Sequence, residues 1–457
     1  MIRFYKKFLL IIFLGLFFML DRELSGLIKD FFSKNLKREI VPGKDYIPAT
    51  GKVFDERELQ NAIEAVLDGC WTHDRFALKF ESEFCSFLGS KNALLCNSGS
   101  SANLLAFSSL LSPGLKERAI KKGSEVITIA ANFPTTVNPI IINNCIPVFV
   151  DVSLQTYNAL PALVADAVTE KTAAIFLPHT LGNPFDLDKI CKIAKEHGLW
   201  LISDNCDALG AKYDGKHLNC FSAISTYSFY PAHHITMGEG GAVATDDDLI
   251  AAIATSIRDW GRDCNCLPGK DNTCGKRFSQ QHGALPFGYD HKYVYSNLGY
   301  NLKATDMQAA IGVAQLEKLP RFIEKREQNF KCLYNLLKEF DEFFYLPAAE
   351  KKSQPCWFGF PLTIKPESGI ERNELTQFFE QNKIATRLFF AGNISKQPYF
   401  VDNKFEYRLG NGLKNSDLIM QNSFWLGIYP ALSELHFDFM HAVIEKFLRK
   451  KKLGQSS

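Results

Sequence analysis

Neither sign of charge dominates this sequence. Its 457 residues include 52 lysines and arginines against 50 aspartates and glutamates, which gives a formal net charge of +2 at pH 7. A protein that binds nucleic acid through backbone phosphates usually carries a basic excess or a basic stripe. We therefore expect no nucleic-acid partner, and we interpret the basic run at 449–452 as a solvated tail.

The sequence also lacks an apolar run long enough to cross a bilayer as a helix. The run FLLIIFLGLFFML at 8–20 has 13 residues and follows Arg3, Lys6 and Lys7, but no small-residue cleavage site comes after it. A dispensable leader or misassigned start, a membrane-surface anchor, and a true signal or span are the three interpretations left open. We expect a cytoplasmic protein, with peripheral membrane association through residues 8–20 as an alternative.

Cysteine is too sparse for a disulfide scaffold. Twelve cysteines in 457 residues are ordinary for a large enzyme kept in a reducing compartment. Most of them are predicted to be reduced thiols in the core. Cys264, Cys266 and Cys274 are the exception, because they lie close together in the sequence.

What the sequence does have is a regular alternation of helical and strand patterns. An amphipathic helix at 55–69 follows a turn-rich segment at 41–52, and short apolar strands at 125–130, 146–152, 172–180 and 199–205 are separated by helical stretches. This alternation predicts an α/β fold with a mostly parallel sheet covered on both faces. We place a leader and helix at 1–45, a large cofactor-binding domain at 46–325 and a smaller C-terminal α/β domain at 326–457.

Small residues follow a predicted strand in CNSGSSANLLA and place Ser100 and Ser101 where a helix begins. Backbone N–H groups and hydroxyls at such a point can hold an anion. The segment lacks the Gly-Lys-Ser/Thr ending of a Walker loop, and a plain capped turn explains it equally well.

Two aspartates follow another predicted strand, in WLISDNCDALGA. Asp204 and Asp207 therefore lie at the edge where open α/β sheets bind ligands. A carboxylate at that edge can pair with a cationic ring nitrogen, as in pyridoxal enzymes. A capping role is the alternative.

A further absence is that of a lysine in a glycine-rich stretch. The stretch SFYPAHHITMGEGG at 228–241 ends in glycines and contains His233 and His234, but it has no lysine. Together with the serine-rich turn and Asp204, it resembles the DegT/DnrJ/StrS sugar aminotransferase family, whose motif runs Ser-Phe-His-Pro-x-Lys-x-x-x-x-Gly-Glu-Gly-Gly. The resemblance covers roughly residues 45–445 and implies fold type I of the pyridoxal-phosphate-dependent transferases, the aspartate aminotransferase-like fold. Aligning Ser228 and the glycines places His233 at the Schiff-base lysine.

An imidazole at the lysine position changes the chemistry that the resemblance implies. It cannot link covalently to the cofactor, so ordinary aminotransfer is disfavoured. It can still move a proton near neutral pH, and pyridoxamine 5'-phosphate held without a covalent link would bring its own amine. We read His233 as this catalytic base and His234 as structural.

One branch of the family has this histidine and also an iron–sulfur cluster: the RfbH-type CDP-6-deoxy-D-xylo-4-hexulose-3-dehydrases. Its cysteines are spaced Cys-x57-Cys-x-Cys-x7-Cys, and Cys206, Cys264, Cys266 and Cys274 match every interval. The resemblance therefore implies a two-iron two-sulfur cluster on these four thiolates. A tetrahedral zinc site and plain reduced thiols are the alternatives.

The activity implied is that of a CDP-4-keto-6-deoxyglucose 3-dehydrase of 3,6-dideoxyhexose biosynthesis, as used for the O-antigen of lipopolysaccharide. The cofactor amine condenses with the C4 ketone of a CDP-4-keto-6-deoxyhexose, His233 takes a proton from the cofactor, and the C3 hydroxyl leaves. The cluster then passes electrons from an NADH-dependent iron–sulfur flavoprotein reductase, which is the implied partner. The final dideoxyhexose is not specified by the sequence.

The resemblance also assigns residues to the cofactor. Asp204 is implied to pair with the ring nitrogen of pyridoxal or pyridoxamine phosphate, and Asp207 stands where relatives often have glutamine or histidine. Phe133 is implied to stack on the ring. The implied phosphate contacts are Ser100, Ser101 and Ser228.

Two positions of the resemblance concern other contacts. Asn301 matches a residue that reaches across a subunit interface, so a homodimer is implied, and Arg387 lies in a segment that approaches the sugar nucleotide. Three rival functions remain: a lysine-dependent sugar aminotransferase, a glutamate-dependent colitose-type 3-dehydrase without a cluster, and a catalytically silent scaffold. The missing lysine argues against the first, the four cysteines against the second, and the retained Asp204 and Ser228 against the third.

Overall fold

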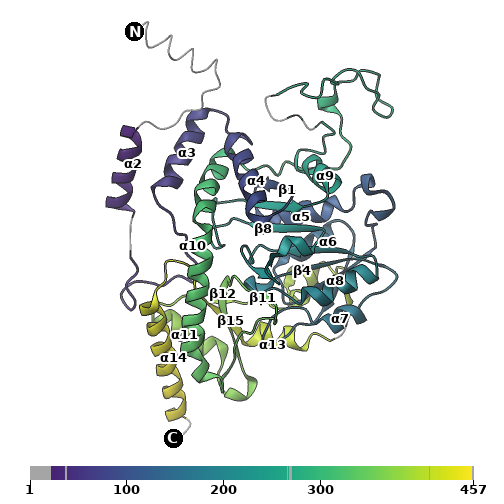
Figure 1. Cartoon of the computed structure of the whole chain (residues 1–457). Helices are drawn as coiled ribbons and strands as arrows, with labels where there is room; N and C mark the ends of the chain where they lie inside the picture. The colour runs from purple at the N-terminus through teal and green to yellow at the C-terminus, as the bar shows by residue number, and fades with distance from the viewer. Residues whose placement is uncertain (1–21, 37–38, 265, 267–269, 411, 455–457) are drawn as a thin grey trace.

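The computed structural model describes residues 22–36, 39–264, 266, 270–410 and 412–454. The apolar run at 8–20 lies outside these residues. Within them, no helix combines the length and the apolar character needed to span a membrane. The first described helix, α2 (Arg22–Asn35), packs against α3 (Glu56–Asp68) (Figure 1).

An eight-stranded sheet forms the centre of the larger region, in the order β1-β9-β8-β5-β4-β2-β3-β14. Neighbouring strands run parallel from β8 to β14, whereas β9 is antiparallel to both β1 and β8. This confirms the predicted α/β fold with a mostly parallel sheet. The strands are β1 (Asn92–Cys96), β2 (Glu125–Ile129), β3 (Ile146–Val150), β4 (Thr172–Pro178), β5 (Trp200–Asp204), β8 (Ile224–Ser228), β9 (Gly241–Thr245) and β14 (Arg408–Leu409).

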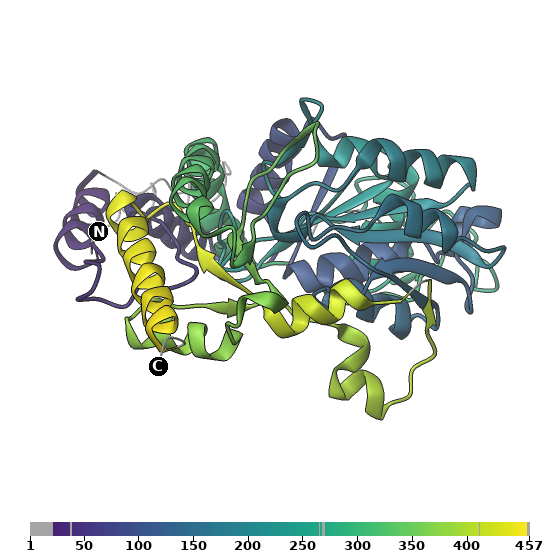
Figure 2. The same cartoon turned by 90° about the horizontal axis from the view of Figure 1, so that it is seen from below.

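Alternation of side chains along buried strands explains why helices cover both faces (Figure 2). In β4, Ala174 and Phe176 pack with α5, α6 and α9, whereas Ile175 and Leu177 pack with α7 and α8. Full burial of a side chain such as Phe176 stabilises the fold by roughly 1.5–3 kcal/mol. These helices are α5 (Gly99–Ser109), α6 (Pro134–Ile142), α7 (Pro161–Asp166), α8 (Leu187–Glu196) and α9 (Asp248–Arg258), and α4 (Arg75–Leu88) packs beside α3 and α10.

A long helix, α10 (Asp306–Leu337), joins the larger region to a C-terminal one and continues through Pro320. Thr305 begins it with a capping box in which the side chain of Gln308 returns to the Thr305 backbone. Beyond it, an antiparallel sheet packs against α11 (Arg372–Gln381) and α14 (Glu434–Gly454). Its strands, in spatial order, are β10 (Phe344–Tyr345), β12 (Gly359–Ile364), β15 (Ser423–Gly427) and β13 (Arg387–Leu388).

Segments cross between the two regions in both directions. Ile47 lies in the core of the C-terminal region, and β14, from the C-terminal part of the chain, pairs with β3. A small sheet of β6 (Lys212–Tyr213), β7 (Lys216–His217) and β11 (Ser353–Gln354) adds another connection. Two further helices, α12 (Pro398–Asp402) and α13 (Lys414–Asn422), complete this part. The proposed limits at 46 and 326 stay a prediction.

The described residues of a long segment between α9 and α10, 259–264, 266 and 270–300, project beyond the body of the molecule (Figure 1). Its base is closed by a bridge between Asp259 and Asn301 and another between Arg262 and Tyr295. We call this segment the cysteine loop, because it carries Cys264, Cys266 and Cys274.

Candidate functional site

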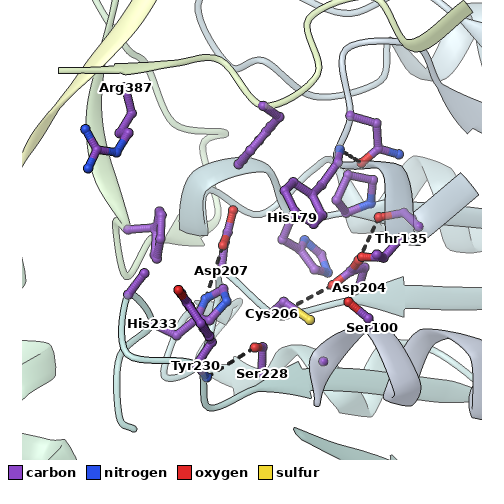
Figure 3. Close-up of a pocket in the computed structure, with 18 of the residues that line it drawn as sticks. Ser100, Thr135, His179, Asp204, Cys206, Asp207, Ser228, Tyr230, His233 and Arg387 are labelled. Atoms are coloured by element: carbon purple, nitrogen blue, oxygen red, sulfur yellow. Dashed lines mark hydrogen bonds and ion pairs between the residues drawn. The ribbon is translucent and has the colours of Figure 1, made fainter. Parts of the chain in front are cut away.

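A cavity of ≈ 490 Å³ opens where the carboxyl ends of β4, β5 and β8 meet the C-terminal region (Figure 3). Ser100, Asp204 and His233 line it from the larger region, and Phe358 and Arg387 line it from the C-terminal region. Open α/β sheets bind ligands at this edge. The cavity therefore collects residues from segments far apart in the sequence.

Asp204, at the end of β5, is buried and held by three donors. Its Oδ2 accepts hydrogen bonds from Asn103 Nδ2 at 2.7 Å and from Thr136 Oγ1 at 2.7 Å. Its Oδ1 accepts from the backbone N–H of Cys206 at 3.0 Å. Three donors stabilise a carboxylate in one orientation, which is what an acceptor for a protonated ring nitrogen requires.

The serine-rich turn forms the start of α5 next to Asp204. The Ser98 side chain accepts from the backbone N–H of Ser101 and caps the helix. Gly99 and Ser100 line the cavity, whereas Ser101 does not and hydrogen-bonds to Ser98 Oγ instead. Ser228, at the end of β8, faces the same turn, and its Oγ accepts from the backbone of Tyr230 at 3.4 Å.

Gly99 is required by this close approach of α5 to β8. A Cβ at this position would collide with Ser228 and contact Cys206 Sγ. The absence of a side chain lets backbone N–H groups at the helix start face the cavity. The turn can therefore hold a phosphate as well as cap a helix.

His233 follows β8 and lines the cavity beside Asp207. His233 Nδ1 lies 3.4 Å from Asp207 Oδ1, although the two are not aligned as a hydrogen bond. Burial raises the pKa of the Asp207 carboxyl, and His233 opposes that shift. Asp207 orients the His233 ring, in the way that a triad aspartate orients its histidine. Because Nδ1 faces Asp207, Nε2 is the nitrogen left for proton transfer.

Arg326, a fully buried residue of α10, secures the backbone around His233. Its guanidinium donates to the carbonyls of Phe358 at 3.0 Å and His233 at 3.4 Å. Burial lowers the pKa of Arg326 to about 10, so it stays charged at neutral pH. The Phe358 ring packs 5.1 Å from the His233 ring. The hydrogen bond from Arg326 and the packing of Phe358 thus both restrain His233.

His234 turns away from the cavity. Its Nε2 lies 2.8 Å from the carbonyl of Cys356, and the side chain is buried. Burial lowers its pKa well below the ordinary value, so the ring is neutral. This agrees with a structural rather than a chemical role.

Phe133 and Asn301 differ in their relation to the cavity. Phe133, at the start of α6, lines it with 52% of the residue exposed, and its ring makes an edge contact with Phe390 at a centroid distance of 6.2 Å. The exposed part of Phe133 is available for a contact with a bound ring. Asn301 lies at the base of the cysteine loop, where its side chain accepts from Lys303 Nζ at 2.8 Å, and it is not among the cavity residues.

The structure does not bring the four spaced cysteines together. Cys264, Cys266 and Cys274 line one small hollow of the cysteine loop, whereas Cys206 lines the main cavity beside Asp204. The hydrogen bond from Thr273 is the main cause that lowers the pKa of Cys266 to about 7, which favours a thiolate ligand. Burial raises the pKa of Cys206 well above its ordinary value. Three of the four cysteines share a hollow because they belong to one loop, whereas Cys206 lies after β5.

Sequence reasoning missed three residues of the site. Asn103 and Thr136 orient Asp204 from α5 and α6, and His179 lines the cavity at the end of β4. His179 stands in the strand segment TAAIFLPHT, so its place after an apolar run was a usable signal. Asn103 and Thr136 had no such signal in the sequence, because their roles depend on how the helices pack.

Comparisons with known proteins show which sequence family the chain belongs to. The profile of the DegT/DnrJ/EryC1/StrS aminotransferase family matches residues 53–446. The lipopolysaccharide biosynthesis protein RfbH of Salmonella typhimurium is 53% identical over 429 residues, which are 94% of this chain and 98% of that protein. The dTDP-4-dehydro-2,6-dideoxy-D-glucose 3-dehydratase of Saccharopolyspora spinosa is 47% identical over 94% of this chain and 92% of its own.

A solved structure has the same fold. The E. coli GDP-4-keto-6-deoxy-D-mannose-3-dehydratase with bound hydrated PLP superposes with a TM-score of 0.78 at 29% identity, covering 89% of this chain and 100% of that one. The predicted fold type I architecture is confirmed by this likeness.

Proposed function

Because the chain belongs to the DegT/DnrJ/EryC1/StrS aminotransferase family, we propose that it is a nucleotide-sugar 3-dehydrase that uses pyridoxamine 5'-phosphate. One observation carries the proposal: an imidazole, His233, occupies the cavity where the family motif has a lysine. The relatives RfbH and the two sugar 3-dehydratases support an enzyme of deoxysugar and lipopolysaccharide biosynthesis.

The residues of the cavity fit the cofactor. Asp204, held by three donors, suits the ring nitrogen, and the start of α5 with Ser100 and Ser228 suits the phosphate. Phe133, exposed in the cavity wall, suits a stacking contact with the ring. When bound, the cofactor supplies an amine for the C4 ketone of the sugar and a ring that withdraws electrons. Ser101 contributes through the helix cap rather than from the cavity wall.

His233 is the proton-transfer group of the proposed reaction. With the cofactor bound, Nε2 would accept a proton from its C4' carbon, and Asp207 beside Nδ1 would stabilise the resulting cation. Arg326 keeps the backbone of His233 in place. The protonated His233 would give that proton to the C3 hydroxyl, which leaves as water, and Arg387 on the cavity wall is the proposed contact that positions the sugar.

We further propose a two-iron two-sulfur cluster on Cys206, Cys264, Cys266 and Cys274, since a cluster of this kind passes single electrons. Such a cluster requires the cysteine loop to close on a cavity that contains Cys206, in the same chain or in a second copy. The partner that supplies the electrons is an NADH-dependent iron–sulfur flavoprotein reductase. We propose a cytoplasmic homodimer, with Asn301 near the subunit interface.

Turnover of CDP-4-keto-6-deoxyglucose with pyridoxamine 5'-phosphate tests the function directly. With NADH and a reductase of the flavoprotein class, we expect a product that lacks the C3 hydroxyl, detected by mass spectrometry. Without reductase, water elimination should occur without net reduction of the sugar. A 4-amino sugar as the product would mean an aminotransferase, and turnover sustained by glutamate alone would mean a cluster-free colitose-type enzyme. The dTDP and GDP analogues measure the nucleotide preference.

Asp204→Asn is expected to weaken binding of pyridoxamine phosphate by about 10- to 150-fold, which corresponds to about 1.5–3 kcal/mol for a lost charge-assisted hydrogen bond. The amide keeps the shape but removes the negative charge that favours a protonated ring nitrogen. Equilibrium titration by absorbance measures the change. Asp214→Asn, on an exposed turn between β6 and β7, is the matched control. Unchanged affinity in Asp204→Asn would remove Asp204 from the cofactor site.

A further inference from the structure

His179 lines the cavity, and the proposed reaction leaves it without a role. It follows β4, and its backbone N–H donates to the carbonyl of Asp204 at 3.0 Å. The ring is fully buried and stacks on Phe185, with centroids 4.1 Å apart and planes at 4°. Figure 3 shows His179 among Asp204, Cys206 and Asp207. A ring held this firmly presents its two nitrogens in defined directions.

The hydrogen bond at one nitrogen of His179 decides which tautomer is present. The backbone N–H of Phe185 donates to Nδ1 at 3.3 Å, so Nδ1 carries a lone pair. In a neutral imidazole the proton must then be on Nε2. Burial lowers the pKa of His179 to about 3, which keeps the ring neutral throughout the physiological pH range. Nε2 is therefore a permanent hydrogen-bond donor.

That donor has no partner among the described residues. His179 Nε2 is buried without a hydrogen bond, and buried donors are almost always satisfied in folded proteins. The neighbouring Asp207 is engaged by His233. An acceptor atom of a bound molecule in the cavity would complete the site.

The order of the strands indicates which acceptor this is. Ser228 ends β8, Asp204 ends β5 and His179 follows β4, and these three strands are adjacent in that order. In a pyridoxal ring, the phosphate arm and the ring hydroxyl lie on opposite sides of the line from the ring nitrogen to C4. A ring with its phosphate at Ser228 and its nitrogen at Asp204 has its hydroxyl on the side of β4.

We propose that the Nε2–H of His179 donates a hydrogen bond to the ring oxygen at C3 of the bound cofactor and holds that oxygen in its ionised form. The inference rests on the proposed function, because it needs the cofactor in this cavity. His179 is a contact residue of the cofactor and does not move a proton. Its donor stays in place whatever the charge on His233.

The pKa of the ring hydroxyl, read from the absorbance of bound pyridoxal 5'-phosphate against pH, tests the assignment. A donor stabilises the ionised oxygen and lowers this pKa, so His179→Phe should raise it by about one to two units. His179→Gln places an amide N–H near the position of Nε2 and should restore at least half of the difference. An equal pKa in wild type and His179→Phe overturns the proposal.

A second measurement leaves the chain unchanged and covers the case in which His179→Phe does not fold. The buried Nε2–H is expected to give an exchange-protected proton signal that shifts downfield on addition of pyridoxal phosphate. An analogue that lacks the ring hydroxyl should bind without this shift, and an equal shift with both overturns the assignment. Failure of the wild type to bind pyridoxal phosphate at all would instead refute the proposed function.

Discussion

Replacing His233 with asparagine is expected to lower kcat by about 10²- to 10⁴-fold, the usual contribution of a general acid–base group. The amide keeps hydrogen bonding but cannot accept a proton near neutral pH. Because the imidazole acts in the transition state, the KM for the sugar nucleotide should change little. Steady-state turnover with saturating pyridoxamine phosphate measures both constants.

The control for this variant is His197→Gln, which alters an exposed histidine after α8. It should keep the wild-type kcat. A His233→Asn enzyme with undiminished kcat would show that another group moves the proton. Asp207→Asn offers an intermediate case, because it removes the charge beside His233 Nδ1 but leaves the imidazole.

His233→Lys examines the same position from the opposite direction. It supplies the amine that the family motif has and this chain lacks. We expect a covalent link to pyridoxal phosphate that borohydride reduction makes permanent and that mass spectrometry locates at residue 233. Absence of that link would place His233 outside bonding range of the cofactor and would refute its alignment with the family lysine.

The second large expected effect is the loss of iron when one of the four spaced cysteines is replaced. Each of the serine variants at Cys206, Cys264, Cys266 and Cys274 is expected to lose the visible absorbance and nearly all of the about two iron atoms per chain that a two-iron cluster contains. Serine replaces a soft thiolate ligand with a hydroxyl of similar size. Iron, sulfide and zinc analysis of anaerobically purified protein measures the loss. Cys220→Ser is the control, since this exposed cysteine lies outside the spacing motif.

Cys206→Ser is the most informative member of this set, because Cys206 lies apart from the other three. Retention of iron in that variant would contradict the four-cysteine site. His291 would then be the next candidate for the fourth ligand, because it lines the same hollow as the loop cysteines. A colourless wild type that contains zinc would contradict the cluster altogether.

Mixed dimers test whether the proposed cluster takes the cysteine loop and Cys206 from one chain or from two. A Cys206→Ser chain paired with a Cys266→Ser chain contains one intact loop and one intact Cys206, on different copies. A cluster in this mixed dimer means that the loop of one copy closes on the cavity of the other. If wild type holds iron and the mixed dimer holds none, the ligands come from a single chain.

Local sequence patterns were enough to predict strands and the edge of the sheet where the site lies. The strand at 172–180 was visible because Ala174 to Leu177 are apolar without interruption, as expected for a strand buried on both faces. The serine-rich turn and Asp204 could be placed at the carboxyl edge of the sheet because parallel strands put their ends on one side. Residues of the C-terminal region such as Phe358 could not be placed there, since no local pattern reports which faces pack across a cavity.

The sequence by itself determined the family, the fold class and the loss of the lysine at His233, because these depend on motif, periodicity and residue identity. Tertiary structure alone decided that Asn103 and Thr136 orient Asp204, that His179 Nε2 has no partner in the described part of the chain, and that Cys206 is separate from the cysteine loop. The physical reason is that hydrogen bonds and burial join atoms by distance in space. Asn103 and Thr136, which share an oxygen of Asp204, lie 101 and 68 positions from it in the sequence, and no spacing rule connects them.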